Sequence, residues 1–170
     1  SSLQSQLGED VAIIRCMPNT PAMIGLGASA LYAADSVSAA HRELAEKVTN
    51  AAGNTVWVNR EELLDAVTAV SGSGPAYFFA LIEAIARTGT ELGLEEEVAM
   101  ALTVQTALGA ASLAAQAKDP VATLRENVTS PGGTTEKALQ SLQANDFDAV
   151  VAEAVRQCAA RASALGEEFG

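Results

Sequence analysis

The feature that most restricts the fold of this sequence is a pair of consecutive helical runs, residues 75–92 and 95–117, that are apolar on nearly every side. The large side chains of the first run form two faces, one with Tyr77, Leu81 and Ile85 and the other with Phe78, Phe79 and Ile82. A helix on the surface of a monomer needs a polar face. A domain of about a hundred residues cannot bury two such helices by itself. The pattern therefore predicts an obligate dimer.

The second run also has to be compared with a transmembrane helix, because residues 98–117 carry no charge and are about as long as a bilayer is thick. Polar side chains interrupt the run, alanine adds little insertion energy, and the flanks lack a bias towards Lys and Arg. We therefore predict no membrane partner. The run is expected to be a helix that is buried on nearly all sides.

The composition excludes several classes of protein. Hydrophobic residues make up 49% of the 170 residues, which excludes a disordered chain, and aromatic residues make up only 4%. Alanine supplies much of the apolar content, so the helices should pack through small side chains. The net charge is −11, and the ten Lys and Arg residues are scattered singly, which predicts no nucleic-acid partner.

The cysteines and the single histidine do not form a reactive or metal-binding pattern. Cys16 and Cys158 lie far apart in the sequence, and His41 lies in a polar, surface-like segment. We therefore expect no metal ion, a reduced cytoplasmic location, a solvated His41 and two cysteines that act as small core residues.

The first third of the chain alternates between strands and a helix. Short apolar runs at residues 11–16, 28–33 and 55–58 predict strands, and a helical spacing over residues 38–52 predicts a helix that Gly53 ends. Such a small parallel sheet would leave its faces and edges uncovered. Residues 1–58 are therefore expected to be the tail of an α/β sheet.

From Glu61 onward the sequence predicts only helices. They are expected at residues 61–70, 75–92, 95–117, a short stretch after Pro120, 134–143 and 147–164. The predicted fold is mainly α, with an all-helical dimerisation domain at residues 59–170.

Two segments rich in Pro, Gly and Ser have alternative interpretations. Residues 15–21, Arg-Cys-Met-Pro-Asn-Thr-Pro, follow a presumed strand, where α/β sheets bind ligands, but an ordinary proline turn explains them equally well. Residues 71–77, Ser-Gly-Ser-Gly-Pro-Ala-Tyr, either allow close approach of a ligand to the backbone or form a tight corner between helices. The residues alone favour the corner slightly.

A third segment, Asn-Val-Thr-Ser-Pro-Gly-Gly-Thr-Thr at residues 127–135, opens a helix and predicts an anion cradle. Backbone N–H groups and the positive end of the helix dipole meet there, beside the hydroxyls of Ser130, Thr134 and Thr135. The alternative is a capped helix whose Ser and Thr side chains satisfy their own backbone. The glycine content favours the cradle, with a small carboxylate as its ligand.

Motifs for strong acid–base or covalent chemistry are not found in this sequence, which lacks a Ser-His-Asp set and a paired-carboxylate motif. Its three lysines, Lys47, Lys118 and Lys137, do not lie in a glycine-rich helix of the kind that presents the catalytic lysine of hydroxyacid dehydrogenases. A reaction that depends on orientation and one hydrogen bond is compatible with these residues.

Taken in this order, the three segments, together with Asp-Ala-Val-Thr at residues 65–68, resemble pyrroline-5-carboxylate reductase over essentially the whole chain. The resemblance implies reduction of 1-pyrroline-5-carboxylate to L-proline by NADPH or NADH. It also implies a Rossmann-like dinucleotide-binding domain, with residues 1–58 as its C-terminal remnant. Residues 59–170 are then the helical dimerisation and substrate-binding domain, which dimerises with its twin, often within a decamer.

The resemblance also implies roles for individual residues. It places the substrate carboxylate at Ser130, Gly132, Gly133, Thr134 and Thr135. It gives the Thr135 hydroxyl a hydrogen bond to the ring nitrogen and makes it the candidate proton donor. It puts Asn127 and Glu61 near the ligands. It places Met17, Pro18, Asn19 and Thr20 at the nicotinamide, and Ser73 and Pro75 beside the pocket.

The glycine-rich dinucleotide fingerprint of the family, G-x-G-x-x-G, does not open any helix of this sequence. The chain is therefore expected to be the C-terminal portion of such an enzyme, to bind NADPH weakly or not at all, and to be inactive or weakly active by itself. The alternatives are a non-catalytic helical dimerisation module, or another imine or hydroxyacid reductase of the same architecture.

Overall fold

The computed structural model describes residues 6–8 and 11–169. The chain divides into two compact units. The sheet unit comprises Ser1–Tyr77 with Glu153–Gly170, and the helical unit comprises Phe78–Ala152. The fold is mainly helical with one small sheet, as the sequence predicts.

The sheet has three strands in the order β1 (Ile14–Met17), β2 (Gly27–Ala33), β3 (Gly53–Trp57). β2 and β3 are parallel, but β1 pairs antiparallel to β2, so the prediction of a parallel sheet is wrong for β1. The physical reason is the connection between β1 and β2. It contains only the short 3-10 helix Thr20–Ile24, whereas a parallel pair needs a longer crossover, which α2 (Ala39–Asn50) supplies between β2 and β3.

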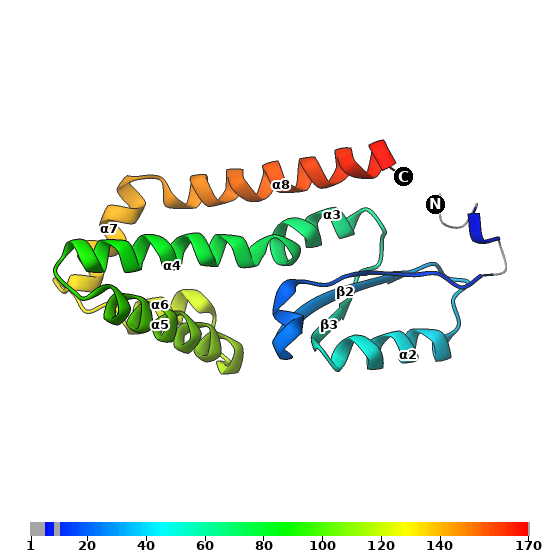
Figure 1. The fold of residues 1–170 in the computed structure, drawn as a ribbon, viewed down its shortest axis with the longest axis horizontal. Helices are drawn as coiled ribbons and strands as arrows, with labels where there is room; N and C mark the ends of the chain where they lie inside the picture. Colours follow the sequence, from blue (N-terminus) through cyan, green and yellow to red (C-terminus); the bar gives the residue numbers. More distant parts are fainter. Residues whose placement is uncertain (1–5, 9–10, 170) are drawn as a thin grey trace. The chain divides into compact units, whose positions relative to one another are not determined.

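The core of the sheet unit lies on the central strand. Ala30 and Leu31 of β2 are each only 1% exposed. Helix α2 covers one side of the strands (Figure 1). The Trp57 indole of β3 donates a hydrogen bond to the Glu46 carboxylate of α2 at 3.0 Å. On the other side lie α3 (Leu63–Val67) and its buried Leu64.

Gly53 is the first residue of β3. The prediction that it ends the preceding helix is therefore wrong. The φ of Gly53 is +148°, and a Cβ at this position would lie 2.0 Å from the Gly27 carbonyl oxygen. Glycine is needed here because the two strand ends meet in direct backbone contact. Helix α2 ends instead at Asn50, and at its other end the Ser38 side chain accepts a hydrogen bond from the His41 N–H. His41 is exposed, as predicted.

Residues 71–74 do not form a helix–helix corner, which corrects the slightly favoured interpretation of that segment. Helix α3 passes through a π-helical turn, Thr68–Gly72, into α4 (Gly74–Glu91), and Leu63–Glu91 is one helical run. π-Helical turns inside helices often accompany functional sites, because the local change in register redirects side chains.

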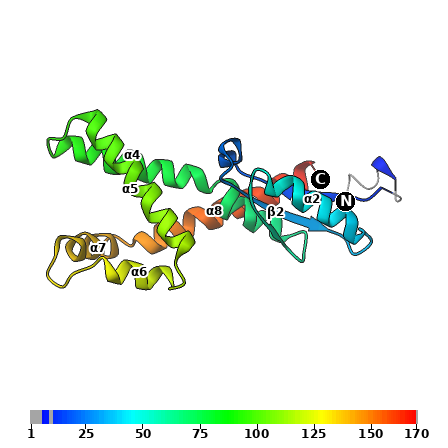
Figure 2. The ribbon, with the colours of Figure 1, turned by 90° about the horizontal axis from the view of Figure 1, so that it is seen from below.

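The helical unit contains most of α4, then α5 (Glu96–Gln116), α6 (Val121–Asn127), α7 (Thr134–Ala144) and the start of α8 (Phe147–Phe169). Helices α4 and α5 form a hairpin (Figure 2). They approach closely at Gly89, where an added Cβ would lie 3.3 Å from the Ala99 Cβ. The predicted helices agree with these bounds to within a few residues, except that α8 is longer.

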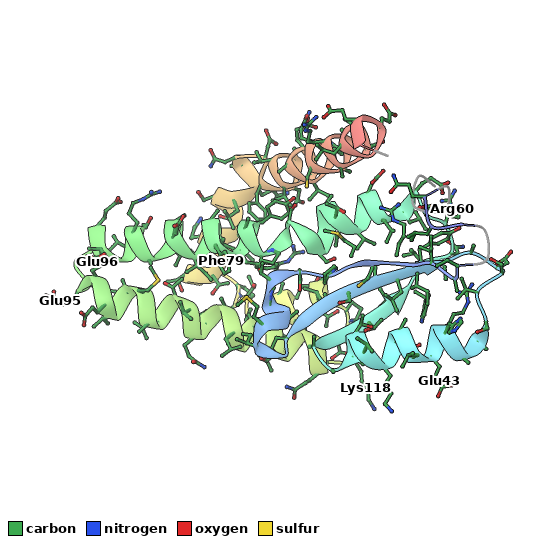
Figure 3. The ribbon with its side chains drawn as sticks, turned by 45° about the vertical axis from the view of Figure 1, so that its right-hand side comes forward. Glu43, Arg60, Phe79, Glu95, Glu96 and Lys118 are labelled. Carbon is green, nitrogen blue, oxygen red and sulfur yellow. The ribbon has the colours of Figure 1, made fainter. Side chains whose placement is uncertain are left out.

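The single chain does not bury the second run on nearly all sides, and burial of this helix by a second copy stays a prediction. Only Ala99 and Thr103 of α5 are buried, and Phe78, Phe79, Ile85 and Leu102 are at least half exposed. Figure 3 shows Phe79 on α4, with Glu95 and Glu96 at the N-terminal end of α5. Two helical runs are long and apolar enough to cross a membrane, Leu63–Glu91 and Glu96–Gln116. This is weak evidence for a membrane protein, because the core helices of soluble proteins meet the same criteria.

The Arg42 side chain stabilises the sheet unit at the end of β2, and its loss should be measurable. Its guanidinium donates hydrogen bonds to the carbonyls of Ala33 at 3.0 Å and Ala34 at 2.8 Å, and lies 5.3 Å from the centre of the Trp57 ring. Arg42→Ala should lower the unfolding free energy of this unit by about 1–3 kcal/mol. Urea unfolding followed by the fluorescence of Trp57, the single tryptophan, measures this loss.

Arg60→Ala is the matched control, because the Arg60 side chain is exposed and forms no ion pair or hydrogen bond with the described residues. It should change the unfolding free energy by less than about 0.5 kcal/mol. Equal effects of the two substitutions would contradict the role of Arg42.

Candidate functional site

The loop after β1 is held in place by one side chain, that of Asn19. The Asn19 Nδ2 donates to the Ser71 carbonyl at 3.0 Å, and its Oδ1 accepts from the Ala28 N–H at 2.9 Å. One half-buried amide thus ties the loop both to β2 and to the π-helical turn. Pro21 follows in the first turn of the 3-10 helix and restricts the backbone further.

Met17 makes a second link between the loop and the π-helical turn. A Cβ added to Gly72 would lie 2.4 Å from the Met17 methyl carbon, so the missing side chain of Gly72 makes room for Met17. The structure therefore brings Met17 and Asn19, predicted near the nicotinamide, to residues 71–72 of the second segment. Pro18 and Thr20, predicted at the same place, are exposed on this loop.

Ser73 and Tyr77 lie in a small polar cluster with Cys158 of α8. The Cys158 thiol is 3.1 Å from the Ser73 hydroxyl oxygen, and the Tyr77 hydroxyl donates to the Ala69 carbonyl at 3.1 Å. The hydrogen bond with Cys158 and, secondarily, burial raise the pKa of Tyr77. A tyrosine with a raised pKa stays protonated at neutral pH, so it can position groups but does not act as a base there. Pro75 is half-buried in the first turn of α4, beside Ser73.

The prediction that both cysteines are core residues is wrong for Cys16, which is exposed, while Cys158 is half-buried. Cys16 lies on β1, a strand with a largely exposed surface. Partial desolvation raises the pKa of the Cys16 thiol, against the opposing effect of a hydrogen bond with Ser29. The thiol is therefore protonated at neutral pH and is a poor nucleophile.

Glu61, predicted near the ligands, forms an ion pair with Arg15 at 2.8 Å. The pair joins β1 to the start of α3, and both side chains are at least one-third exposed. Exposed pairs of this kind contribute at most about 1 kcal/mol to stability. The sequence analysis did not predict the pair, and the spacing of 46 residues carries no local signal for it.

An apolar cavity of about 380 Å³ lies within the sheet unit, against β2, β3 and α3. Its lining includes Ala28, Ala30 and Val56 from the strands and Ala66 and Val70 from the helical side. Ser71, whose carbonyl accepts from Asn19, also lines it. The Asn19 amide thus links the loop after β1 to Ser71, one of the residues that line this cavity.

The third segment connects α6 to α7 in the helical unit. Asn127 is the exposed last residue of α6, and Gly133 is the N-cap of α7. Gly132 has a φ of +72°, which glycine adopts without strain, and the Gly133 N–H donates to the Ser130 carbonyl at 3.0 Å. The turn thereby directs the chain into the helix at Thr134.

The first N–H groups of α7 are available to a ligand. Among the described residues, the backbone N–H groups of Thr134 and Thr135 and the Thr135 hydroxyl have no hydrogen-bond partner. The hydroxyls of this segment do not cap the helix, because the N-cap is glycine and the Thr129 hydroxyl donates back to the Arg125 carbonyl at 2.6 Å. The alternative of a helix capped by its own Ser and Thr side chains is therefore wrong.

Glu136 was not predicted as part of this segment, but it shapes the loop. Its carboxylate accepts a hydrogen bond from the Gly132 N–H at 2.8 Å. A glutamate three residues after the N-cap commonly bonds the N–H of the N-cap residue, so the sequence contained a partial signal. Here the carboxylate bonds the N–H of Gly132, one residue before the N-cap Gly133. The carboxylate uses one N–H of the loop and leaves those of Thr134 and Thr135 free.

The described residues contain no group of three or more His, Cys, Asp or Glu side chains that could hold a metal ion. The free donors of the third segment are instead suited to an anion. Two N–H groups at a helix N-terminus and one adjacent hydroxyl can hold a carboxylate together with a neighbouring hydrogen-bonding atom.

Comparison with known proteins gives a consistent result. The family described as pyrroline-5-carboxylate reductase dimerisation matches residues 61–165. The pyrroline-5-carboxylate reductase of Pseudomonas aeruginosa is 50% identical to this chain, over 100% of the chain and 62% of the relative. That of Pasteurella multocida is 41% identical over 99% of the chain and 62% of the relative.

Solved structures of such enzymes also superpose closely. A pyrroline-5-carboxylate reductase from Coxiella burnetii has a TM-score of 0.93 and 40% identity, over 96% of this chain and 60% of that one. The Plasmodium falciparum pyrroline carboxylate reductase with NADP bound has a TM-score of 0.88 and 32% identity, over 96% of this chain and 62% of that one. The chain thus spans less than two-thirds of the length of these relatives.

The hydrogen bonds of Asn19 can be tested without any ligand. Asn19→Ala removes the acceptor of the Ala28 N–H, so this amide should exchange with solvent about five- to tenfold faster, as expected for the loss of about 1 kcal/mol. Asn19→Asp should leave the Ala28 exchange rate nearer to that of the wild type, because a carboxylate still accepts.

Hydrogen exchange followed by NMR gives both rates. The Val58 N–H, bonded to the Leu31 carbonyl at 2.9 Å, is the internal control and should not change. An unchanged Ala28 rate in Asn19→Ala would contradict the role given to this side chain.

Proposed function

This chain belongs to the pyrroline-5-carboxylate reductase dimerisation family, and from this membership we propose that it supplies the dimerising and substrate-binding part of an enzyme that reduces 1-pyrroline-5-carboxylate to L-proline with NADPH or NADH. The observation that carries the proposal is the set of free donors on α7. They are the N–H groups of Thr134 and Thr135 and the Thr135 hydroxyl. The names of the relatives, at up to 50% identity, support the same reaction.

In this proposal the substrate carboxylate binds at the start of α7. The Thr134 and Thr135 N–H groups donate to its oxygens, and Ser130, Gly132 and Gly133 form the loop around it. The helix dipole favours an anion at this end, within the first turn. Asn127, at the exposed end of α6, borders the same loop.

The Thr135 hydroxyl has a separate role. It donates a hydrogen bond towards the ring nitrogen of the cyclic imine and so favours addition of hydride at the adjacent carbon. The carbon gains the hydride, the nitrogen gains a proton, and the C=N bond becomes the single bond of a secondary amine. Positioning of the two reactants contributes most of the rate enhancement in such a reaction.

The nicotinamide cofactor supplies the hydride when it is bound. The residues that would hold its nicotinamide end are Met17, Pro18, Asn19 and Thr20, with Ser73 and Pro75 beside them. The structure supports this fit because Asn19 and Met17 fix the loop against the π-helical turn, with Pro18 and Thr20 exposed. Asn19 uses both of its polar atoms on the backbone, so its role is to hold the loop in shape.

A second copy of the chain is the proposed cover of the apolar helix faces. An apolar cavity of about 410 Å³ lies between α4 and α5, lined by Phe78, Ile82, Ile85 and Leu102 among others. The dimerisation family and the exposure of these side chains both favour self-association. A non-catalytic dimerisation module would use the same surface.

The role of Thr135 is tested by two substitutions in the full-length enzyme. Thr135→Ala removes the hydroxyl and should lower kcat/KM for 1-pyrroline-5-carboxylate by about a hundredfold, at the lower end of what one proton-donating group contributes. Thr135→Ser keeps a hydroxyl and should lose less than about tenfold. Oxidation of NADPH measured at 340 nm gives both values, and full activity of Thr135→Ala would count against the imine reduction.

The dimer is tested with the chain itself. The wild type should sediment at 34.8 kDa, twice the 17.4 kDa of one chain. Ile85→Glu places a charge in the cavity between α4 and α5 and should produce monomers or aggregates. Val48→Glu is the matched control because Val48 is also exposed, at 64%, but lies on α2. A wild-type monomer would disprove the proposed dimer.

A further inference from the structure

We propose that Glu136 tunes the affinity of the α7 cradle for its ligand in two opposing ways, by ordering the loop through a hydrogen bond and by repelling the ligand through its charge. The inference rests on the proposed function, which puts the substrate carboxylate at Thr134 and Thr135. It makes Glu136 a positioning and specificity-determining residue that does not touch the reacting atoms.

The ordering effect follows from the hydrogen bond to Gly132. The Glu136 carboxylate accepts from the Gly132 N–H at 2.8 Å, and Gly132 has the left-handed φ of +72° that turns the chain into α7. A second bond, from the Gly133 N–H to the Ser130 carbonyl at 3.0 Å, closes the turn. Without Glu136, only this second bond and the helix itself would fix the turn. The donors at Thr134 and Thr135 would then be less well placed.

The repulsive effect follows from the position of Glu136 in the first turn of α7. Thr134 and Thr135 directly precede it, so a carboxylate on their N–H groups lies within a few ångströms of a second carboxylate. Two like charges at such a distance repel, and salt screens them incompletely because they are closer than a Debye length. Among the described residues Lys137 forms no ion pair with Glu136, and its ammonium group donates instead to the Gln140 side chain at 3.2 Å, further along the helix.

The two effects can be separated because glutamine keeps one and removes the other. In Glu136→Gln the amide oxygen still accepts from the Gly132 N–H, but the negative charge is gone. The KM for 1-pyrroline-5-carboxylate should therefore fall about threefold, with kcat changed by less than about twofold. In Glu136→Ala both effects are lost, and the disordered turn should raise KM to at least the wild-type value and about three times that of Glu136→Gln.

A substrate without a carboxylate provides the charge control. With 1-pyrroline, a cyclic imine that lacks the carboxylate, Glu136→Gln should have the same KM as the wild type. Glu97→Gln is the matched protein control, because Glu97 also lies in the first turn of a helix, α5, and its removal changes the net charge equally. It should leave both KM values unchanged.

The experiment is steady-state kinetics of the full-length enzyme and these three variants, with both imines and NADPH. A lower KM for 1-pyrroline-5-carboxylate in Glu136→Gln alone supports the inference. An unchanged or raised KM in Glu136→Gln, or an equal fall with 1-pyrroline, overturns it while the wild type still turns over. Absence of turnover in the wild type overturns the proposed function and this inference together.

Discussion

The need to bury the apolar surface of α4 and α5 is the constraint on which the rest of the structure depends. Within one chain these helices meet through small residues, with Ala86 and Ala99 buried and Gly89 allowing close approach. The larger side chains, such as Phe78 and Leu102, stay exposed. A self-complementary surface on a second copy would bury all of them at once, since a two-fold dimer repeats each contact twice. The helical unit thus presents an apolar surface that a second copy of the chain would complete to a buried core.

In the sheet unit, a few polar side chains fix the backbone of the loops. Asn19 joins the loop after β1 to the π-helical turn, and Arg42 binds the carbonyls at the end of β2. Such bonds cost little to make but leave unsatisfied buried groups when one partner is lost. The loop can therefore be well ordered in a unit whose fully buried side chains are few.

The helices could be predicted from the sequence because the 3.6-residue period and Gly or Pro punctuation are local signals. The antiparallel direction of β1 was not predicted, because an apolar run carries no information on strand direction. The short connection between β1 and β2 does carry this information. The π-helical turn could not be predicted, because its register depends on distant contacts such as that of Met17 with Gly72. The anion cradle, inferred from Gly-Gly and the neighbouring hydroxyls, stays a prediction. The hydrogen bond from the Gly132 N–H to the Glu136 carboxylate was not predicted, because it depends on the shape of the loop before the helix.

The anion binding proposed at α7 needs a local reason, because the protein as a whole is acidic. The net charge of −11 is spread over the chain, and charges further than about 8–10 Å from a site are largely screened at physiological salt. The partial positive charge at the start of α7 acts only within the first turn. A ligand bound to the N–H groups of Thr134 and Thr135 would lie within this range. The carboxylates that influence the site are then those within the same turn. Among the residues of α7, Glu136 is the single acidic one in that turn, so local geometry outweighs the charge of the whole surface.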